Sequence, residues 1–206
     1  MFEIHMKFRI FTYKTGFKIT INKIIYTILF ASLGVAYLGS KLFEDDNIVE
    51  NIGKIGVYLG CILMIFFKMT QNFIREPLNG ILNGELQFFE NEILINKNIY
   101  SLSEIKKIEF YVSDYFNEWK FRGKGDFNPS KSNGTCNICK ITLNNGDKIA
   151  INFQLMYNRE FLKMRELLIK YHSENKIHFL KLIEYLRIDD YEDIQEFKKT
   201  LPVTSA

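Results

Sequence analysis

Residues 24–40 read IIYTILFASLGVAYLGS, a run of 17 residues without a charged side chain. At about 1.5 Å per residue, a helix of this length spans about 26 Å, slightly less than the ~30 Å hydrocarbon core of a bilayer. Extending the run back to Ile19 gives about 22 residues, because Lys23 can turn its amine towards the lipid headgroups. The stretch therefore predicts a membrane-spanning helix at about residues 22–40.

A second apolar run follows at residues 55–67, IGVYLGCILMIFF, between two lysines. Its 13 residues are too few to cross a bilayer, and extension to residue 74 adds polar side chains. Taken alone, the run fits either a buried helix of a soluble protein or a membrane span. Beside the first run, it predicts a second helix at about 54–74 and a transmembrane hairpin domain at 19–74.

Charged residues around the two runs alternate in sign. Segment 1–23 has five basic residues and one acidic residue, connector 41–54 has two basic and four acidic residues, and Lys68 and Arg75 follow the second run. Basic residues concentrate on the cytoplasmic side of membrane proteins. This pattern predicts an integral protein of the cytoplasmic (inner) membrane with both termini in the cytoplasm. The three cysteines fit a reducing compartment, because they are too few for a disulfide framework.

Two other interpretations of the apolar runs remain open. A secretory signal peptide has a short basic segment before its apolar run, whereas 23 residues precede this one. A soluble protein could also bury both helices in its own core. Small residues favour close packing of membrane helices. The glycines that could serve in this way are Gly34, Gly39, Gly53, Gly56 and Gly60.

The N-terminal segment alternates between apolar and polar residues. From Phe2 to Ile10 every even position is apolar, and each odd position is charged or His. Such alternation predicts a half-buried strand, and a single strand needs a partner sheet. We expect an N-terminal domain at 1–18 whose strand joins the sheet of the C-terminal half, with residues 17–21 as the second strand of a β-hairpin. An amphipathic segment on the membrane surface is the alternative.

Short apolar segments predict a β-rich module at 75–172. These segments are rich in aromatic and branched residues, as strands are. They lie at 85–90, 92–97, 99–102, 108–112, 115–121, 137–143 and 148–153. Residues 103–107 are expected to form one helical turn. The pair Asn145-Gly146, between the last two segments, is a strong hairpin signal because two-residue hairpin turns need positive φ.

The apolar period changes to 3.6 residues after Asn158, which we expect to cap a helix. The apolar face of this helix comprises Phe161, Leu162, Met164, Leu167, Leu168 and Tyr171. A further helix is expected to follow, and its apolar stripe comprises Phe179, Leu180, Ile183 and Leu186. Asp189 or Asp190 is expected to cap a last amphipathic helix. These additional C-terminal helices make up a segment at 173–206.

The two apolar runs are followed by three short motifs, Gly84-Glu85-Leu86, Ile93-Leu94-Ile95 and Leu102-Ser103-Glu104-Ile105-Lys106-Lys107-Ile108. In this arrangement the chain resembles the bacterial pleckstrin-homology-like (PH-like) membrane proteins. The resemblance covers about residues 75–170 and consists mainly of hydrophobic pattern. It implies a cytoplasmic barrel tethered by two helices, and most family members have no assigned activity. The predicted fold class is therefore α+β, with a two-helix transmembrane hairpin, a PH-like antiparallel β-barrel or sheet, and C-terminal helices.

Residues suited to catalysis or metal binding are few, and each also has a structural interpretation. Cys136 and Cys139 form a lone C-x-x-C motif, whereas a zinc site needs four ligands and strand positions i and i+3 face opposite sides. Other titratable residues lie at predicted helix ends or on the polar side of a strand. They are His5, His172, His178, Asp189, Asp190, Glu192 and Asp193. We therefore predict no metal site, no cofactor and no catalytic residue.

The best candidate for a binding site is the loop at residues 120–126, KFRGKGD. It combines three cations with two glycines, so that side chains and backbone amides could surround an anion. In PH-like barrels such a loop can hold a lipid headgroup, and a membrane tether keeps it near anionic lipid. The predicted ligand-binding residues are Lys120, Arg122, Gly123, Lys124 and Gly125. A solvated loop is the alternative.

No nucleotide-binding, hydrolase or metal-binding motif occurs in the sequence. Residues 75–206 carry 19 basic and 19 acidic residues, so nucleic acid is not an expected partner. We expect a non-enzymatic, membrane-tethered PH-like module that binds a protein partner or an anionic headgroup on the cytoplasmic face. Its partners would be the lipid bilayer, that headgroup and a protein bound through the C-terminal helices. The alternatives are a structural subunit of a larger membrane complex and an enzyme whose site is not recognisable from sequence.

Overall fold

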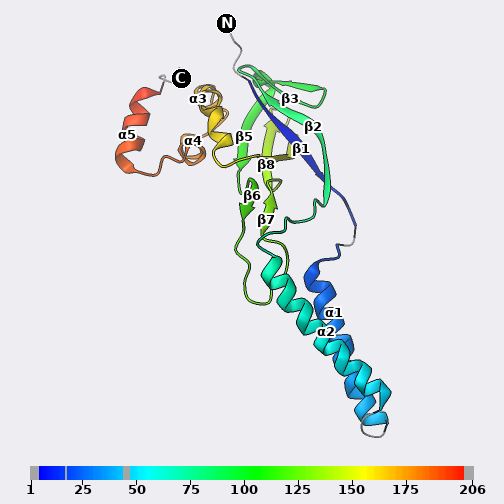
Figure 1. The fold of residues 1–206 in the computed structure, drawn as a ribbon. Helices are drawn as coiled ribbons and strands as arrows, with labels where there is room; N and C mark the ends of the chain where they lie inside the picture. The colour runs from blue at the N-terminus through cyan, green and yellow to red at the C-terminus, as the bar shows by residue number, and fades with distance from the viewer. Residues whose placement is uncertain (1–4, 17, 44–46, 202–206) are drawn as a thin grey trace. The chain divides into compact units, whose positions relative to one another are not determined.

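The computed structural model describes residues 5–16, 18–43 and 47–201 (Figure 1). The chain divides into two compact units. The sheet unit comprises Met1–Lys14, Leu78–Glu118 and Asn133–Ala206, and the hairpin unit comprises Thr15–Pro77 and Trp119–Ser132. Residues 119–132, expected within the β-rich module at 75–172, thus group with the helical hairpin.

Seven strands form one antiparallel sheet in the order β4-β3-β2-β1-β9-β8-β5. Their bounds are β1 Met6–Tyr13, β2 Gly80–Phe88, β3 Glu92–Ile95, β4 Asn98–Ser101, β5 Ile105–Tyr111, β8 Asn137–Leu143 and β9 Lys148–Gln154. Two further strands, β6 Phe116–Trp119 and β7 Lys131–Asn133, form a separate pair. Among the described residues β4 and β5 remain the two edges of the sheet. The structure is therefore an open antiparallel sheet, and the closed barrel that was the other expected form is not present there.

The N-terminal strand β1 lies inside this sheet, between β2 and β9. Phe8 is opposite Leu86, and Ile10 is opposite Phe153. Phe8 and Ile10 face the core, whereas Lys7 and Arg9 are exposed, as period-two alternation requires. The alternation ends at the register shift between Arg9 and Phe11, and Phe11 is buried as well. Positions 1–4 of the expected strand lie outside the described residues.

The expected β-hairpin partner at residues 17–21 is wrong for the residues that are described. Residues 18–20 are not in a strand, and Ile21 is the first residue of helix α1 (Ile21–Leu42). Thr20 caps this helix by accepting a hydrogen bond from Lys23 N. An N-cap of this kind is favourable, and the pairing that β1 needs is supplied instead by β2 and β9.

Local signals located several turns correctly. A two-strand hairpin joins β8 to β9 through residues 144–147, and Gly146 has a φ of 95°. The helical turn expected at 103–107 is a single 3₁₀ turn, η1, at Leu102–Glu104. It is closed by a capping box between Ser101 and Glu104. Residues 105–107, which were expected in the turn, instead begin strand β5.

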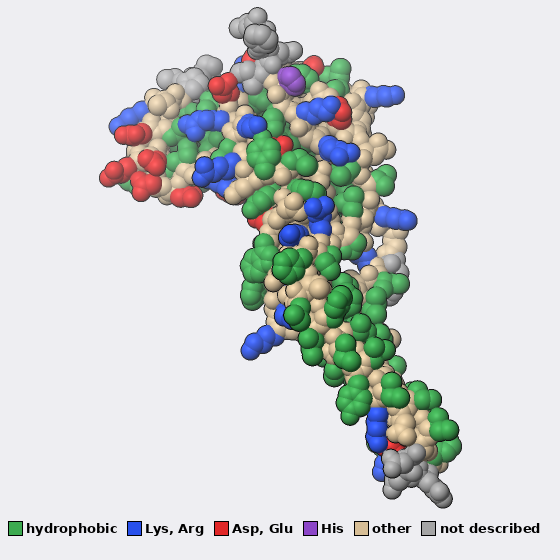
Figure 2. Space-filling view, in the orientation of Figure 1, with side chains coloured by type: hydrophobic (Ala, Val, Ile, Leu, Met, Phe, Trp, Pro, Cys, Tyr) green, Lys and Arg blue, Asp and Glu red, His purple; other side chains and the backbone are tan. Residues whose placement is uncertain are grey.

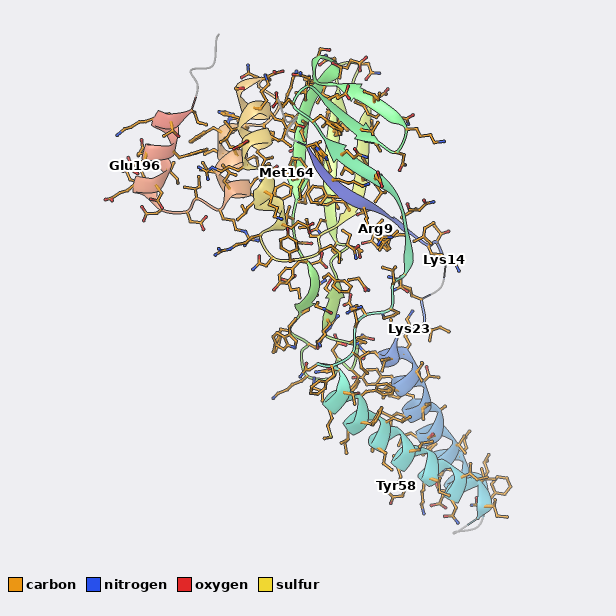
Figure 3. All side chains as sticks on the ribbon, turned by 45° about the horizontal axis from the view of Figure 1, so that its top comes forward. Arg9, Lys14, Lys23, Tyr58, Met164 and Glu196 are labelled. Carbon is orange, nitrogen blue, oxygen red and sulfur yellow. The ribbon has the colours of Figure 1, made fainter. Side chains whose placement is uncertain are left out.

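Helices follow the last strand. They are η2 Glu160–Met164, a 3₁₀ helix, then α3 Arg165–Ser173, α4 Phe179–Leu186 and α5 Tyr191–Thr200. Their apolar residues join the core of the sheet, where Met164 is fully buried (Figure 3). Phe88, Phe153 and Tyr171 are also fully buried in this core.

Two details of the predicted helices are wrong. Asn158 is not an N-cap, because η2 begins after Arg159, whose backbone is left-handed at φ 72°, and the Asn158 side chain instead accepts a hydrogen bond from Arg187. The core face of α4 consists of Leu182, Tyr185 and Leu186, whereas Leu180 is 63% exposed. The prediction for the last helix is confirmed, because Asp190 caps α5.

The hairpin unit contains α1 and the antiparallel helix α2 (Ile48–Thr70). α2 begins six residues before the predicted position 54 and ends before 74. Its N-cap Asn47 accepts a hydrogen bond from Glu50 N, and Glu50 pairs with Lys54 at 2.8 Å, so charged residues that were expected in the connector are helical.

Small residues allow the two helices to touch. A Cβ on Gly53 would lie 2.3 Å from the backbone nitrogen of Ala36, and a Cβ on Gly39 would lie 2.6 Å from the nitrogen of Glu50. Gly56 and Gly60 have similarly close neighbours on α1. Gly34, however, has nothing within 4 Å of its Cβ position, so it does not belong to the helix interface.

Most large apolar side chains of the hairpin point outward, and Ile25 is an exception that is fully buried. Both helices are long and apolar enough to cross a membrane, and only 6% and 11% of the residues in their apolar windows are buried. Phe30 is 70% and Ile48 is 77% exposed. Tyr58, 69% exposed, also lies on the outer surface of α2 (Figure 3). Figure 2 shows hydrophobic side chains along the visible face of both helices.

Candidate functional site

Residues 119–132, here called the docking loop, contact the first turns of α1. The Asn22 amide donates to Asp126 Oδ1 at 3.0 Å and accepts from Phe127 N at 2.8 Å. The Tyr26 hydroxyl donates to the carbonyl oxygen of Gly125 at 2.8 Å. The end of the sequence KFRGKGD and the residue that follows it are therefore held by two side chains of α1, about 100 residues earlier in the chain.

The docking loop also contacts the end of α2. Lys68 Nζ donates to the carbonyl oxygens of Gly123 and Asp126, at 3.1 and 3.3 Å. Ser130 N donates to the carbonyl oxygen of Gln71 at 2.8 Å, and Trp119 Nε1 donates to Asn72 Oδ1 at 3.0 Å. The loop therefore connects the N-terminal end of α1 with the C-terminal end of α2.

The predicted anion-binding residues all lie in this loop. Arg122 pairs with Glu76, donates to the carbonyl oxygen of Pro129 and lies 3.6 Å from Asp126. Its charge is therefore already balanced within the hairpin unit. Lys124 is exposed.

The remaining predicted residues contribute backbone contacts. Lys120 N donates to the carbonyl oxygen of Ser130. Gly123 and Gly125 accept hydrogen bonds through their carbonyl oxygens, so these groups are used to hold the loop on the helices. Anion binding by the five residues stays a prediction.

Asp126 is the central acceptor of the docking loop. Burial raises the pKa of its carboxyl, but hydrogen bonds from Asn128 and Asn22 and the charge of Arg122 lower it, and the net pKa lies below the usual value. The carboxylate is thus ionised at neutral pH and holds the loop together in that form.

Aromatic side chains of the hairpin unit are exposed beside basic ones. Phe121 is 80% exposed, and Trp119, whose ring lies 6.2 Å from that of Phe121, is also exposed. Phe73, near the end of α2, is exposed as well, and Lys124 lies in the same loop. Aromatic and basic residues in combination are typical of a membrane–water interface.

The C-x-x-C motif does not place its sulfurs together. Cys136 is exposed, whereas Cys139 lies on β8 in the core, opposite Phe110. Burial raises the pKa of the Cys139 thiol well above its ordinary value, so this thiol is protonated and unreactive. In the described ranges no group of three metal-ligating side chains is found.

The other singled-out residues have structural contacts. His172 Nδ1 lies 2.8 Å from the carbonyl oxygen of Ile177, His178 caps α4, and the ring of His5 stacks on Phe89. The acidic cluster Asp189, Asp190, Glu192 and Asp193 lies at the start of α5, as expected. Carboxylates at this position stabilise a helix.

The sheet unit has a cleft of about 500 Å³ that the sequence did not reveal. It lies beyond the end of β5, and its walls come from residues 110–118, from residues 155–162 and from the end of α4. Its volume falls within the range of small-ligand sites. Because these three segments are far apart in sequence, no local motif indicates the cleft.

Tyrosines and charged residues line this cleft together. Tyr111, Tyr157 and Tyr185 form aromatic parts of the wall, and Arg159 and Arg187 contribute guanidinium groups. Carboxylates at the cleft come from Asp114, Glu118 and Glu184. Burial raises the pKa of Tyr185 to about 12. The hydroxyl of Tyr185 accepts a hydrogen bond from Phe110 N at 2.9 Å.

Comparison with known proteins gave no match to a family model, to a curated protein or to a solved structure. Function is therefore argued from the geometry of the two sites alone.

Proposed function

We propose that the protein is a membrane-anchored binding module without catalytic activity. The hairpin unit crosses the cytoplasmic membrane twice, and the sheet unit is a PH-like domain on the cytoplasmic side. The single observation that carries this proposal is the surface of the hairpin, where most large apolar side chains face outward, whereas Gly39, Gly53, Gly56 and Gly60 face the other helix. In water this arrangement would expose a large apolar surface, which soluble monomers avoid. In lipid it is the expected one.

The docking loop supports the orientation of this anchor. It lies at the end of the hairpin where α1 begins and α2 ends, and there it exposes Trp119 and Phe121 beside Lys124. Tryptophan, phenylalanine and lysine at that level suit the headgroup region of a bilayer. Lys120 and Lys124 would then lie within reach of anionic lipid headgroups, to which each basic residue contributes about 1 kcal/mol.

The PH-like assignment is supported by the strand count and by the helix after the last strand. The open sheet and the helices α4 and α5 depart from the simple pattern of that family. The assignment thus concerns the type of module and does not define a ligand.

A second candidate function is that of a structural subunit in a larger membrane complex. It is favoured by apolar side chains that α4 and α5 expose, Leu180 and Tyr191. Exposed side chains of this kind can anchor a protein partner. Co-purification of one partner at a fixed ratio, lost in a variant with Leu180→Ser and Tyr191→Ser, would favour this function.

The test of membrane insertion is extraction of the full chain. We expect the protein to stay in the membrane pellet after alkaline carbonate washing and to be released by detergent. A matched pair of variants shows whether retention depends on an apolar side chain at position 30. Phe30→Arg places a charge in the bilayer at a cost of about 3 kcal/mol and should release protein, whereas Phe30→Leu should not. Release of the unaltered chain by carbonate alone would contradict the proposal.

Topology is tested by labelling Cys136 in a Cys61→Ala variant. A membrane-impermeant maleimide should label Cys136 in inverted vesicles and leave it unlabelled in intact cells, because Cys136 is exposed and the sheet unit is cytoplasmic in the proposal. Cys139 should react only after denaturation, since its sulfur is buried. Labelling of Cys136 in intact cells would place the sheet unit on the outer face.

A further inference from the structure

Left-handed backbone conformations point to the cleft of the sheet unit. Among the described residues other than glycine, five have positive φ. Three of them are Asn96, Asn117 and Asn175, and asparagine is the usual non-glycine residue in this region. The other two are Arg159 and Arg187, and both line the cleft.

The left-handed backbone at these two positions does not require arginine. Arg187, at φ 55°, follows the last turn of α4 and closes it with hydrogen bonds to the carbonyl oxygens of Ile183 and Glu184. Glycine is the favoured residue at such a position. Arg159, at φ 72°, precedes η2 and makes no side-chain cap. Strained backbone of this kind is often found where a side chain has a binding role.

Both guanidinium groups retain unused donors. Arg187 Nη1 donates to Asn158 Oδ1 at 3.1 Å, which is a neutral amide. Within the described part of the chain, the Arg159 guanidinium has no hydrogen-bond or ion-pair partner. Arginine is suited to planar oxyanions because its five N–H groups form a rigid fork.

The carboxylates of the cleft restrict the kind of anion. Asp114 accepts from Cys136 N, Glu118 accepts from Tyr115 N, and Glu184 pairs with Lys181. Because Lys181 balances Glu184, the two carboxylates of Asp114 and Glu118 remain against the two guanidinium groups. This balance disfavours a ligand with several negative charges, such as a phosphorylated headgroup. A single carboxylate is compatible with this balance.

The edge of the sheet favours an extended ligand. The outward N–H groups of Ile108 and Phe110 on the edge strand β5 donate to Lys176 O and to the Tyr185 hydroxyl. Val112 lies two residues beyond Phe110, just past the end of β5, and lines the cleft. This is the point at which an extended peptide would meet the backbone, as in β-strand addition, with the rings of Tyr111 and Tyr157 beside it.

We propose that the cleft binds an extended peptide segment through a carboxylate held by Arg159 and Arg187. The proposal rests on the binding role argued above and names the ligand of that role. The carboxylate could belong to an acidic side chain or to a chain terminus, and both have the same recognition chemistry. A phosphate-bearing ligand is an outcome of the test that would overturn it.

The probe is a library of random decapeptides, selected by mRNA display against the full chain in nanodiscs and counter-selected against empty nanodiscs. Selected peptides are synthesised, and their Kd is measured by fluorescence anisotropy. The variants are Arg159→Gly and Arg187→Gly, which remove the guanidinium groups while glycine accepts positive φ. Asn175→Gly is the matched control, because it makes the same kind of change at a left-handed position that does not line the cleft.

We expect selected peptides to be enriched in Asp or Glu or to need a free C-terminus. Each arginine variant should raise the Kd about tenfold or more, and the control should leave it unchanged. Replacing the acidic residue by its amide, or amidating the C-terminus, identifies the source of the carboxylate, and either result supports the proposal.

Three results would overturn the proposal. They are the absence of peptides enriched over empty nanodiscs, a Kd that neither arginine variant changes, and displacement of the peptides by inorganic phosphate at lower concentration than by acetate, a monocarboxylate. Membrane insertion is measured separately by carbonate extraction, so failure of the peptide test does not affect that result.

Discussion

The two units of the protein place large and small residues in opposite positions. In the sheet unit the largest side chains, such as Phe88 and Tyr171, are fully buried, and glycines such as Gly146 occupy turns. In the hairpin unit Phe30 is exposed, and Gly53 is buried between the helices. The first arrangement is that of a protein folded in water. The second removes little apolar surface from solvent and depends on close backbone contact, which is the form that packing takes in lipid.

The largest effect that tests this contrast is expected from two Phe→Ala substitutions. Phe88→Ala empties a fully buried site and should lower the unfolding free energy of the sheet unit by about 3–5 kcal/mol, or its Tm by about 10 °C. Phe30→Ala removes an exposed ring and should cost about 0.5 kcal/mol or less. Circular dichroism of the full chain in detergent measures both. Equal losses would show that the two rings have similar surroundings.

Two glycines on the hairpin provide the next test. Gly53→Ala would bring a methyl group to 2.3 Å from the backbone of Ala36 and should cost about 1–3 kcal/mol. Gly34→Ala, on the open side of α1, should leave stability unchanged or raise it by about 1 kcal/mol through helix propensity. Trp119 fluorescence reports this unit, because Trp119 is hydrogen-bonded to Asn72. A loss at Gly34 as large as that at Gly53 would argue against the helix interface.

Features determined by short-range periodicity were predictable from the sequence. In each case the residues that determine the structure lie close together in the sequence. Examples are the two apolar runs, the alternation up to Ile10, the Asn145-Gly146 turn and the Asp190 cap. The start of α2 was misjudged, because Asn47 and the Glu50–Lys54 ion pair extend the helix through charged residues. The role of Asn158 was misjudged for a different reason, because its hydrogen-bond partner is Arg187, 29 residues later in the chain.

The candidate sites depend on long-range contacts and were less predictable. The docking loop was singled out for its charges. Its contacts with Asn22 and Lys68 join residues that are far apart in the sequence, so no local pattern indicates them. The cleft combines three distant segments. Arginine is an unusual residue for positive φ, so nothing in the sequence indicated the backbone of Arg159 or Arg187.

A smaller effect is expected for the docking loop. Asp126→Ala removes the acceptor for Asn22 and Asn128 and should cost about 1 kcal/mol. Amide exchange at Asn128 should then accelerate about fivefold, whereas Asp126→Asn keeps the Oδ1 acceptor and should have less effect.

The pH dependence has a defined sign. The pKa of Asp126 is lower in the folded state, so its contribution is fully present above the unfolded pKa of about 4 and is lost as the pH falls through the folded value. Hydrogen exchange measured across this acidic range should show the wild-type loop opening only at the lower pH. An Asp126→Asn variant with an unchanged pH profile would show that another carboxylate controls the loop.

The smallest expected effect is a gain in stability, whereas most of the substitutions above are expected to lower it. It tests whether Arg187 serves folding or binding in the sheet unit. Arg187→Gly relieves a left-handed arginine at the end of α4 and should leave stability unchanged or raise it by up to about 1 kcal/mol. Lys181→Gly, inside the same helix, should lower stability by about 1 kcal/mol. Denaturant unfolding of the two variants measures this difference. If Arg187→Gly destabilises the protein as much as Lys181→Gly, the arginine side chain has a packing role, and this role accounts for its unfavourable φ without any ligand. If it does not, the strain at Arg187 serves something other than the stability of the fold, which is what a role in the cleft requires.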